Sequence, residues 1–414
     1  LLAAIPVFGL LVLVHEFGHF ITAKWAKIRV EEFGLGFPPA LVGFRKRDQG
    51  GWEVLWFGRG REDDAAGTRS GRQTPFGGTS GGARTVSTSG KAQAVADPSS
   101  HHTIYSLNLL PIGGFVRMPG ENGDVLDEHG NYDPGSFAAK SAGKRMIVLC
   151  AGVVMNLLLA AVLFIIAYST MGEPIALPVV GTVEPGSPAA AAGLRTNDRI
   201  LTVNGQPVQR FDDVVTQVNQ AIQNNKGQQE SVPIHLTIQR AGMSGPLSVS
   251  VDARVNPPAG KGRMGIGQQS SAIGYVSVPI WEAPIKGLQR TAAVLYLFVD
   301  QIRQMIIGAI QPQLAGPVGI VELTGKMAQQ TATQGWWPLL NLTAILSLNL
   351  AIINILPFPA LDGGRVVLVL IEVLRGGKRL KPEREGLINL VGMAILLMLM
   401  AVITVSDILN WGSR

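Results

Sequence analysis

Four apolar runs in this chain are long enough to cross a lipid bilayer as helices, and they constrain the fold more than any other feature. The hydrocarbon core of a bilayer, about 30 Å thick, needs roughly 20 largely apolar residues in a helix. We therefore expect transmembrane helices over 1–26, 145–171, 339–360 and 387–409. The composition agrees, because 47% of the 414 residues are hydrophobic and only 15% are charged, which is apolar for a soluble protein. The predicted fold class is an α-helical polytopic membrane protein.

The first apolar run also has an alternative interpretation as a secretory signal peptide. It lacks the basic segment and the small-residue cleavage site that such peptides carry before their end. We therefore expect it to be retained as a membrane span.

Basic residues flank the predicted spans unevenly. They follow the first span at Lys24 and Lys27, precede the second at Lys144 and Arg145, and gather in the loop 375–384. The positive-inside rule places such flanks in the cytoplasm, so the segment 172–338 and both termini should face outward. The net charge of +6 lies mostly at these flanks, and we expect no nucleic-acid partner.

The region 27–144 between the first two spans combines β-prone and low-complexity sequence. WEVLWF at 52–57 and TIYSLNLLPIGGFVRM at 103–118 favour strands. Between them, 58–100 is rich in Gly, Ser, Thr and Arg, which predicts a disordered cytoplasmic insertion. His101 and His102 stand at its edge, and we interpret them as solvated loop histidines because no further ligands lie at metal-binding spacing.

The segment 177–256 resembles a bacterial PDZ domain. SPAAAAGL is followed by NDRILTVNG, where Asn204 and Gly205 suit a tight hairpin turn. A helix near 212–224 and the strands VPIHLTIQRA and LSVSVDARV complete the pattern, although Asn197 replaces the usual glycine. The resemblance implies an extracytoplasmic α+β domain that binds an extended peptide by strand addition. The alternative is a steric domain without a ligand.

The first predicted span contains the sequence HEFGH, with His15, Glu16 and His19. Residues four apart share a face of a helix, so the two imidazoles can bind one metal ion while Glu16 lies beside them. This is the HExxH arrangement, in which the histidines bind Zn²⁺ and the glutamate is the general base. Ionisable groups are costly at a membrane helix centre, by at least ~2.5 kcal/mol each, so three together need a compensating partner. Hydrogen bonding of the trio between helices is the structural alternative.

A catalytic zinc ion needs a third protein ligand, and two acidic residues in or at the remaining apolar runs are candidates, Asp362 and Glu372. Asp362 lies in NILPFPALDGGR, where Pro357 and Pro359 interrupt the third span. Broken backbone at membrane depth is tolerated where protein buries it or it lines a wet cavity. Such a break favours Asp362 as the carboxylate that reaches the metal.

These motifs in this order resemble the site-2 protease family of intramembrane metalloproteases, and most closely the regulator-of-sigma-E protease type. HEFGH, PIGGFVRMPGE, a PDZ module and NILPFPALDGGR carry the resemblance over nearly the whole chain except 58–100. It implies that His15, His19 and Asp362 ligate Zn²⁺ and that Glu16 activates water.

The resemblance also implies residues that meet the substrate. Asn354 and Pro357 belong to the third-span motif, and Gly113, Gly114 and Phe115 match a membrane-associated β-hairpin. A GPVG segment, 316–319, matches the family without a role that the sequence explains. Members of the sigma-E type commonly carry two PDZ domains, whereas one is recognisable here.

The expected function is hydrolysis of peptide bonds within transmembrane segments of single-span membrane proteins, such as pre-cleaved anti-sigma factors or remnant signal peptides. The expected location is the bacterial inner membrane, with the active site toward the cytoplasm. Two other classes of function remain as alternatives: a catalytically silent PDZ adapter that binds membrane-protein termini, and a metal transporter.

Two features have a simpler interpretation. Cys150, the single cysteine, excludes an internal disulfide and any cysteine-based zinc site, and we interpret it as a small buried hydrophobe. The segment 279–310 is apolar but carries Lys286, Arg290, Asp300 and Arg303, so an amphipathic helix at the outer interface is favoured over a fifth span.

Overall fold

The computed structural model describes residues 3–47, 50–57, 102–121, 132–225, 230–258, 260–269, 272–309, 316–380 and 382–409. The chain forms two compact units. The first contains residues 1–165 and 286–414, and the second contains residues 166–285. The predicted insertion 58–100 and His101 lie outside the described residues.

Within the described ranges, four helices are long and apolar enough to cross a membrane. They are α1 (Ala4–Trp25), α3 (Ala142–Met171), α8 (Trp337–Ile355) and α10 (Pro382–Leu409). Each coincides with one of the runs predicted from the sequence, so the expected number of spans is confirmed. In α10 only 6% of the apolar window is buried within the protein, whereas half of the α3 window is buried. α3 is therefore the most enclosed of the four.

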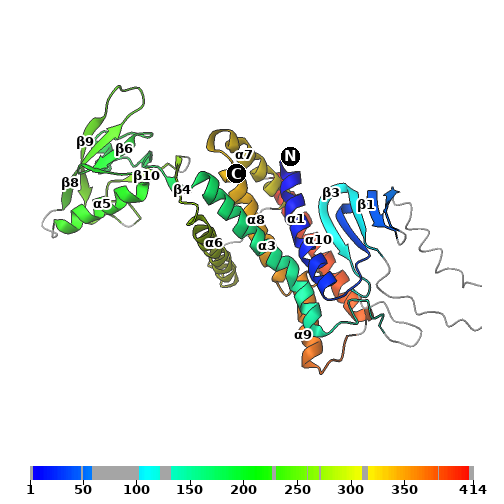
Figure 1. Ribbon diagram of the computed structural model, residues 1–414. Coiled ribbons are helices and arrows are strands. Elements are labelled where there is room, and N and C mark those ends of the chain that lie inside the picture. The colour runs from blue at the N-terminus through cyan, green and yellow to red at the C-terminus, as the bar shows by residue number, and fades with distance from the viewer. Residues whose placement is uncertain are drawn as a thin grey trace, which may run out of the picture. The chain divides into compact units, whose positions relative to one another are not determined.

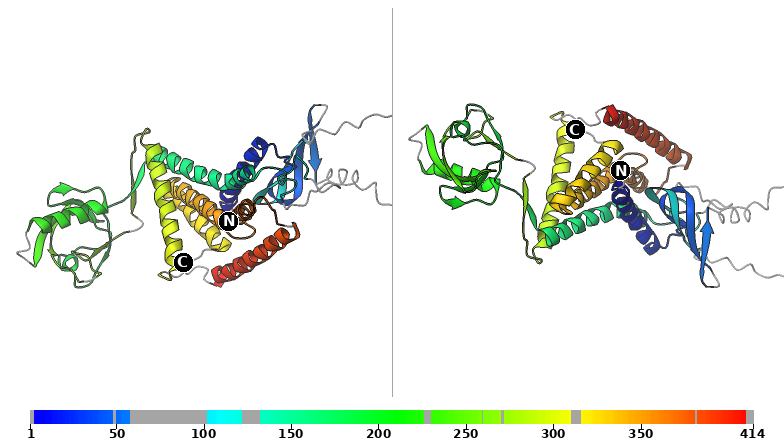
Figure 2. Two further views of the ribbon diagram at one scale, coloured as in Figure 1. Left: turned by 90° about the horizontal axis from the view of Figure 1, so that it is seen from below. Right: turned by 90° about the horizontal axis from the view of Figure 1, so that it is seen from above.

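Helices α1 and α3 cross at two glycines. A Cβ atom on Gly18 of α1 would lie 2.5 Å from the carbonyl oxygen of Ala151 in α3, and one on Gly152 of α3 would overlap the imidazole of His19. Small residues allow such close approach of membrane helices. In the first unit, α1 lies with α3 and α8 on one side and a β-sheet on the other (Figures 1 and 2). Protein therefore covers the face of the HExxH helix that carries His15 and His19, whereas Phe17 is exposed.

The sheet beside α1 has the strand order β2-β1-β3. Its strands are β1 (Glu32–Lys46), β2 (Trp52–Trp56) and β3 (Ile104–Arg117). The sequence predicts β2 and β3 but misses β1, because its Gly and Pro residues are depleted in strands. Residues 32–35 of β1 pair with 104–107 of β3 on one side and with 114–117 on the other. The predicted hairpin is therefore part of a larger sheet.

The third span is broken where the sequence predicts a break. α8 ends at Ile355, and α9 (Asp362–Leu374) begins after the loop 356–361. Gly363 and Gly364 fold back on this loop so closely that a Cβ atom on either would overlap a backbone carbonyl oxygen, of Ile355 and of Phe358 respectively. The two glycines therefore permit the turn that starts α9 at Asp362.

Two further helices complete the first unit. α6 (Ala283–Ile306) lies in the segment predicted as amphipathic, exposes large apolar side chains and is not among the candidate spans. α7 (Pro317–Gln334) begins inside the GPVG segment and packs against α8 and α10. The GPVG residues therefore form a helix N-terminus.

The second unit contains short strands and two helices, consistent with a PDZ-like domain. Its main sheet has the order β7-β6-β8-β9, and the pairs β10-β5 and β11-β4 form two smaller sheets. The strands are β4 (Glu173–Ala176), β5 (Val180–Val183), β6 (Arg199–Val203), β7 (Gln206–Pro207), β8 (Ser231–Gln239), β9 (Leu247–Arg254), β10 (Ile266–Gln268) and β11 (Ile273–Val276). The helices are α4 (Pro188–Ala191) and α5 (Phe211–Asn224). α5 agrees with the helix predicted near 212–224.

Local sequence explains the turns and the core of this unit. Asn204 and Gly205 both have positive φ, 48° and 78°, between β6 and β7, as a two-residue hairpin turn requires. Asn197, at the position where glycine is usual, has φ of 73°, which asparagine tolerates better than most residues. The buried face of α5 and alternate residues of β8 enclose a core that includes Val214, Ile234 and Leu236.

Candidate metal centre

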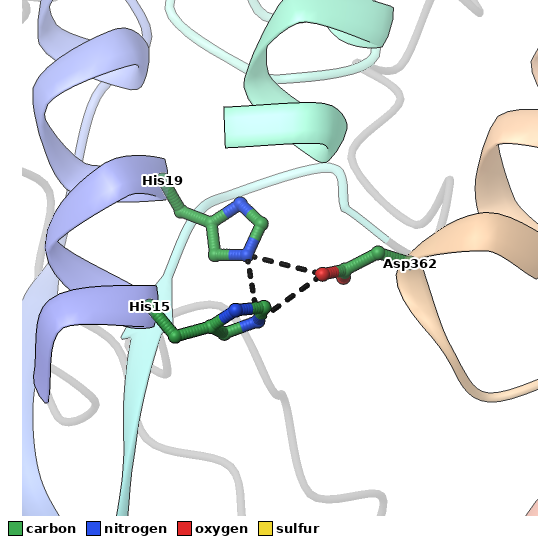
Figure 3. A group of neighbouring side chains, drawn as sticks. All are labelled: His15, His19 and Asp362. Atoms are coloured by element: carbon green, nitrogen blue, oxygen red, sulfur yellow. Dashed lines mark hydrogen bonds and ion pairs between the residues drawn. The ribbon is translucent and has the colours of Figure 1, made fainter. Parts of the chain in front are cut away.

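Two imidazoles and one carboxylate meet inside the first unit. His15 and His19 lie one turn apart on α1, and both are 7% exposed. Their Nε2 atoms point toward Asp362 at the start of α9 (Figure 3). Asp362 Oδ2 lies 3.2 Å from His15 Nε2 and 3.3 Å from His19 Nε2, and the two Nε2 atoms are 3.2 Å apart. Among the described residues, this trio is the group of metal-binding side chains that could hold an ion.

The geometry of the trio fits a small divalent cation. Ligand atoms bound tetrahedrally at about 2.0 Å stand about 3.3 Å apart, which matches all three sides of this triangle. His19 Nδ1 donates to the carbonyl oxygen of Val148 at 2.8 Å, so the Nε2 of neutral His19 carries a lone pair. That lone pair faces Asp362 Oδ2, a buried atom without a hydrogen bond in the described part of the chain. A cation between these atoms would satisfy both.

Glu16 lies on α1 between the two histidines and next to the β-sheet. The side chain is half-buried, and its Cγ atom would be 3.3 Å from a Cβ atom built on Gly114. Gly114 begins the segment 114–117 of β3, which pairs with β1 on one side and has no strand on its other side among the described elements. An edge strand therefore runs beside the carboxylate of Glu16, which the sequence predicts to be the general base.

The other residues nominated from the sequence lie around this centre. Asn354, near the end of α8, places its Nδ2 atom 3.4 Å from His15 Nε2. Pro357 is exposed in the loop that leads to Asp362. Gly113 has φ of 97°, which favours glycine, and the ring of Phe115 covers Gly34 of β1. Asn354 is thus within reach of the metal ligands, whereas Pro357 shapes the loop.

Glu372, the alternative third ligand, does not join the histidines. Its Oε1 atom accepts hydrogen bonds from Arg145 of α3 at 2.6 Å and from Arg379 at 3.2 Å. Its charge is therefore balanced by two guanidinium groups. A second ion pair joins Arg365 of α9 to Glu121. The sequence gives no signal for the pairs Arg145–Glu372 and Arg365–Glu121, because these partners are far apart along the chain.

Comparisons with known proteins agree with this geometry. The model of Peptidase family M50 matches residues 3–60 and 86–399, which is most of the chain. The chain belongs to peptidase family M50. The internal gap in this match, residues 61–85, lies within the segment that the sequence identifies as an insertion.

Curated relatives of this M50 peptidase match it over nearly their full lengths. Zinc metalloprotease RasP of Geobacillus kaustophilus is 28% identical, and the match covers 99% of this chain and 97% of the relative. Zinc metalloprotease RasP of Oceanobacillus iheyensis is 30% identical, with 98% of each chain covered. The probable protease eep of Enterococcus faecalis is 30% identical, with coverage of 98% and 97%.

Family membership establishes the general activity of this M50 peptidase. It is a multi-pass membrane zinc metalloprotease, so the predicted enzyme class and the zinc cofactor are confirmed. His15, His19 and Asp362 form its candidate metal site.

Proposed function

We propose that this protease hydrolyses peptide bonds within transmembrane segments of single-span membrane proteins. The observation that carries the proposal is the position of the metal triangle. Two of its members lie on a membrane-spanning helix, and all three are largely enclosed by protein. A protease with its metal at such a position acts on chains that enter from the bilayer.

We assign His15, His19 and Asp362 as the zinc ligands, each through the atom that faces the other two. Zn²⁺ bound there would supply Lewis-acid activation of a water molecule and of the scissile carbonyl group. Glu16 is the general base: it accepts the proton of the attacking water and returns it to the leaving amine. Asn354, whose Nδ2 atom lies 3.4 Å from His15 Nε2, positions the substrate carbonyl group.

We assign the edge segment of β3, with Gly113, Gly114 and Phe115, to substrate binding. A transmembrane helix hides its carbonyl groups in hydrogen bonds between residues i and i+4, so it must unwind before hydrolysis. Pairing with an unpartnered strand edge gives the unwound segment new hydrogen bonds. The closeness of Gly114 to Glu16 supports this assignment, because the paired segment would pass the base.

The proposed orientation follows the basic flanks of the spans. The metal centre opens toward the cytoplasm, and the PDZ-like domain is extracytoplasmic in the inner membrane of a bacterium. The proposed substrates are membrane proteins already shortened by another protease, such as anti-sigma factors, or remnant signal peptides. The PDZ-like domain would bind their extended termini by strand addition.

Zinc content and cleavage measured on the same detergent-purified protein test the ligands and the base. We expect about one zinc ion per chain in the wild type, loss of zinc in His19→Ala, and retained zinc in Glu16→Gln. Glu16→Gln should cleave a single-span test substrate at least about 100-fold more slowly, since a general base contributes about 10² to 10⁴ in rate.

Two results would contradict the proposal. Turnover at the wild-type rate in Glu16→Gln would remove Glu16 as the base. A wild type that cleaves a soluble unstructured peptide but no membrane-embedded substrate would leave a zinc protease that does not act within the bilayer.

A further inference from the structure

Asn156 is a buried amide that faces the metal centre from α3. The residue is 0% exposed, and its Nδ2 atom lies 3.3 Å from Nδ1 of His15. Its Oδ1 atom is buried and has no hydrogen-bond partner in the described part of the chain. Asn156 is also held from α8, because Ser347 Oγ donates to its backbone oxygen at 2.8 Å. The Asn156 amide is therefore held in place beside Nδ1 of His15, and one of its two polar atoms, Oδ1, lacks a hydrogen bond in the described part of the chain.

The proton on His15 determines which amide atom should face it. His15 directs Nε2 at Asp362 and at His19, so Nε2 is the atom available to a metal. A neutral imidazole bound through Nε2 carries its proton on Nδ1 and donates from there. If the amide NH₂ group of Asn156 faced that proton, two hydrogen-bond donors would face each other and no hydrogen bond could form. A half turn of the amide instead brings Oδ1, the atom without a partner, to His15 Nδ1.

We propose that Asn156 accepts the Nδ1 proton of His15 and thereby positions this imidazole for the metal. The Val148 carbonyl, on the same helix, does the same for His19 at 2.8 Å. Metal-binding histidines characteristically donate their second ring N–H to such an acceptor, which sets the tautomer, the ring orientation and the basicity of the ligand. α3 contributes no metal ligand, yet it orients both histidines.

The inference rests on the proposed ligands, so the test includes them. Zinc dissociation constants of the full chain in detergent are measured by competition with a chelator for wild type, His19→Ala, Asn156→Leu and Asn156→Asp. Leu keeps the size of the side chain without an acceptor, and Asp keeps an acceptor without a donor. Leu163→Ala, which removes a buried side chain elsewhere on α3, controls for lost packing.

We expect Asn156→Leu to weaken zinc binding about 10- to 100-fold. Asn156→Asp should bind zinc at least as tightly as the wild type, and Leu163→Ala should match the wild type. In protein loaded with Co²⁺, the visible absorption bands should change in Asn156→Leu and stay unchanged in Leu163→Ala, because only the first alters the orientation of a ligand.

Wild-type affinity in Asn156→Leu would overturn the inference. Equal weakening in Asn156→Asp and Asn156→Leu would overturn it too, because the amide would then act as a donor or by packing. If His19→Ala retained the zinc of the wild type, or if the wild type bound none, the proposed ligand set would fail and this inference with it. If His19→Ala loses zinc but Asn156→Leu binds zinc as tightly as the wild type, the proposed ligand set stands and only the inference about Asn156 fails.

Discussion

At the scale of single residues, the site depends on glycines as much as on the metal-binding side chains, because glycine lets neighbouring backbone and side chains approach closely. Gly152 of α3 packs on the imidazoles of His15 and His19, and Gly18 of α1 packs on the backbone of α3. Gly363 and Gly364 allow the turn that brings Asp362 to the histidines. Each of these contacts leaves no space for a methyl group, so the metal triangle relies on backbone proximity.

Gly152→Ala tests this dependence. The new Cβ atom would overlap the Nε2 atom of His19 and lie within 3 Å of His15, so we expect loss of most of the bound zinc and of cleavage. Gly143→Ala is the matched control on the same helix, since no atom lies within 4 Å of the added group. It should keep both properties and stabilise α3 by up to about 1 kcal/mol. Full zinc content in Gly152→Ala would contradict the prediction.

At the scale of elements, the GPVG segment gains a structural explanation. It forms the N-terminus of α7, where Gly319 N–H donates to Asp407 Oδ2 at 2.9 Å. Asp407 lies near the end of α10 and is 4% exposed. A Cβ atom on Gly316 would lie 2.7 Å from the same carboxylate. A carboxylate at a helix N-terminus satisfies free N–H groups and interacts favourably with the helix dipole, so Asp407 connects α10 to α7.

Asp407→Ala should therefore lower the thermal unfolding midpoint of the first unit. A lost N-terminal cap costs about 1–2 kcal/mol. Asp407→Asn keeps an acceptor oxygen but loses the charge, and its midpoint should lie between those of Asp407→Ala and the wild type. Circular dichroism in detergent measures the three midpoints. Identical midpoints for Asp407→Ala and the wild type would show that the contact contributes nothing.

At the scale of the whole molecule, two compact units have separate cores and separate chemistry. The metal centre belongs entirely to the first unit. The second unit depends on a buried ion pair: Asp198, 1% exposed, accepts two hydrogen bonds from Arg240 at 2.8 Å. Burial raises the pKa of Asp198, but the bonds from Arg240 and from the Arg195 N–H outweigh it and hold the pKa below its usual value.

This pairing makes the stability of the second unit sensitive to acid. Because the pKa of Asp198 is lower in the folded state, its contribution is present above the unfolded value of 3.8 and is lost as the pH falls through the folded pKa. We expect calorimetry of the full chain to show two transitions. The transition of the second unit should move to lower temperature below about pH 4.

Asp198→Asn should lower this second transition already at pH 7, since hydrogen bonds to a charged group are worth about 1.5–3 kcal/mol. The transition of the first unit should stay where it is in the wild type, because Asp198 contacts only residues of its own unit. A single transition that moves as a whole would mean that the two units unfold together.

Features that depend on near neighbours in the chain can be predicted from the amino-acid sequence alone. Apolar runs of sufficient length predict the four spans, and the four-residue spacing of His15 and His19 places them on one helix face. Prolines predict the end of α8, and Asn204 with Gly205 predict a tight turn. Each of these features depends on local backbone geometry, so each can be predicted without a structure.

Which groups distant in the chain meet depends on how the helices and strands pack. The structure brings Asp362, the ligand that the sequence favours, to the histidines, and it pairs Glu372 with Arg145 of α3. It also places Asn156 behind His15, and Gly114 beside Glu16. These encounters arise from the packing of helices and strands that are remote in the chain, and no local periodicity encodes them. The α1 helix presents two of the ligands, and the elements packed around it supply the third and complete the metal centre.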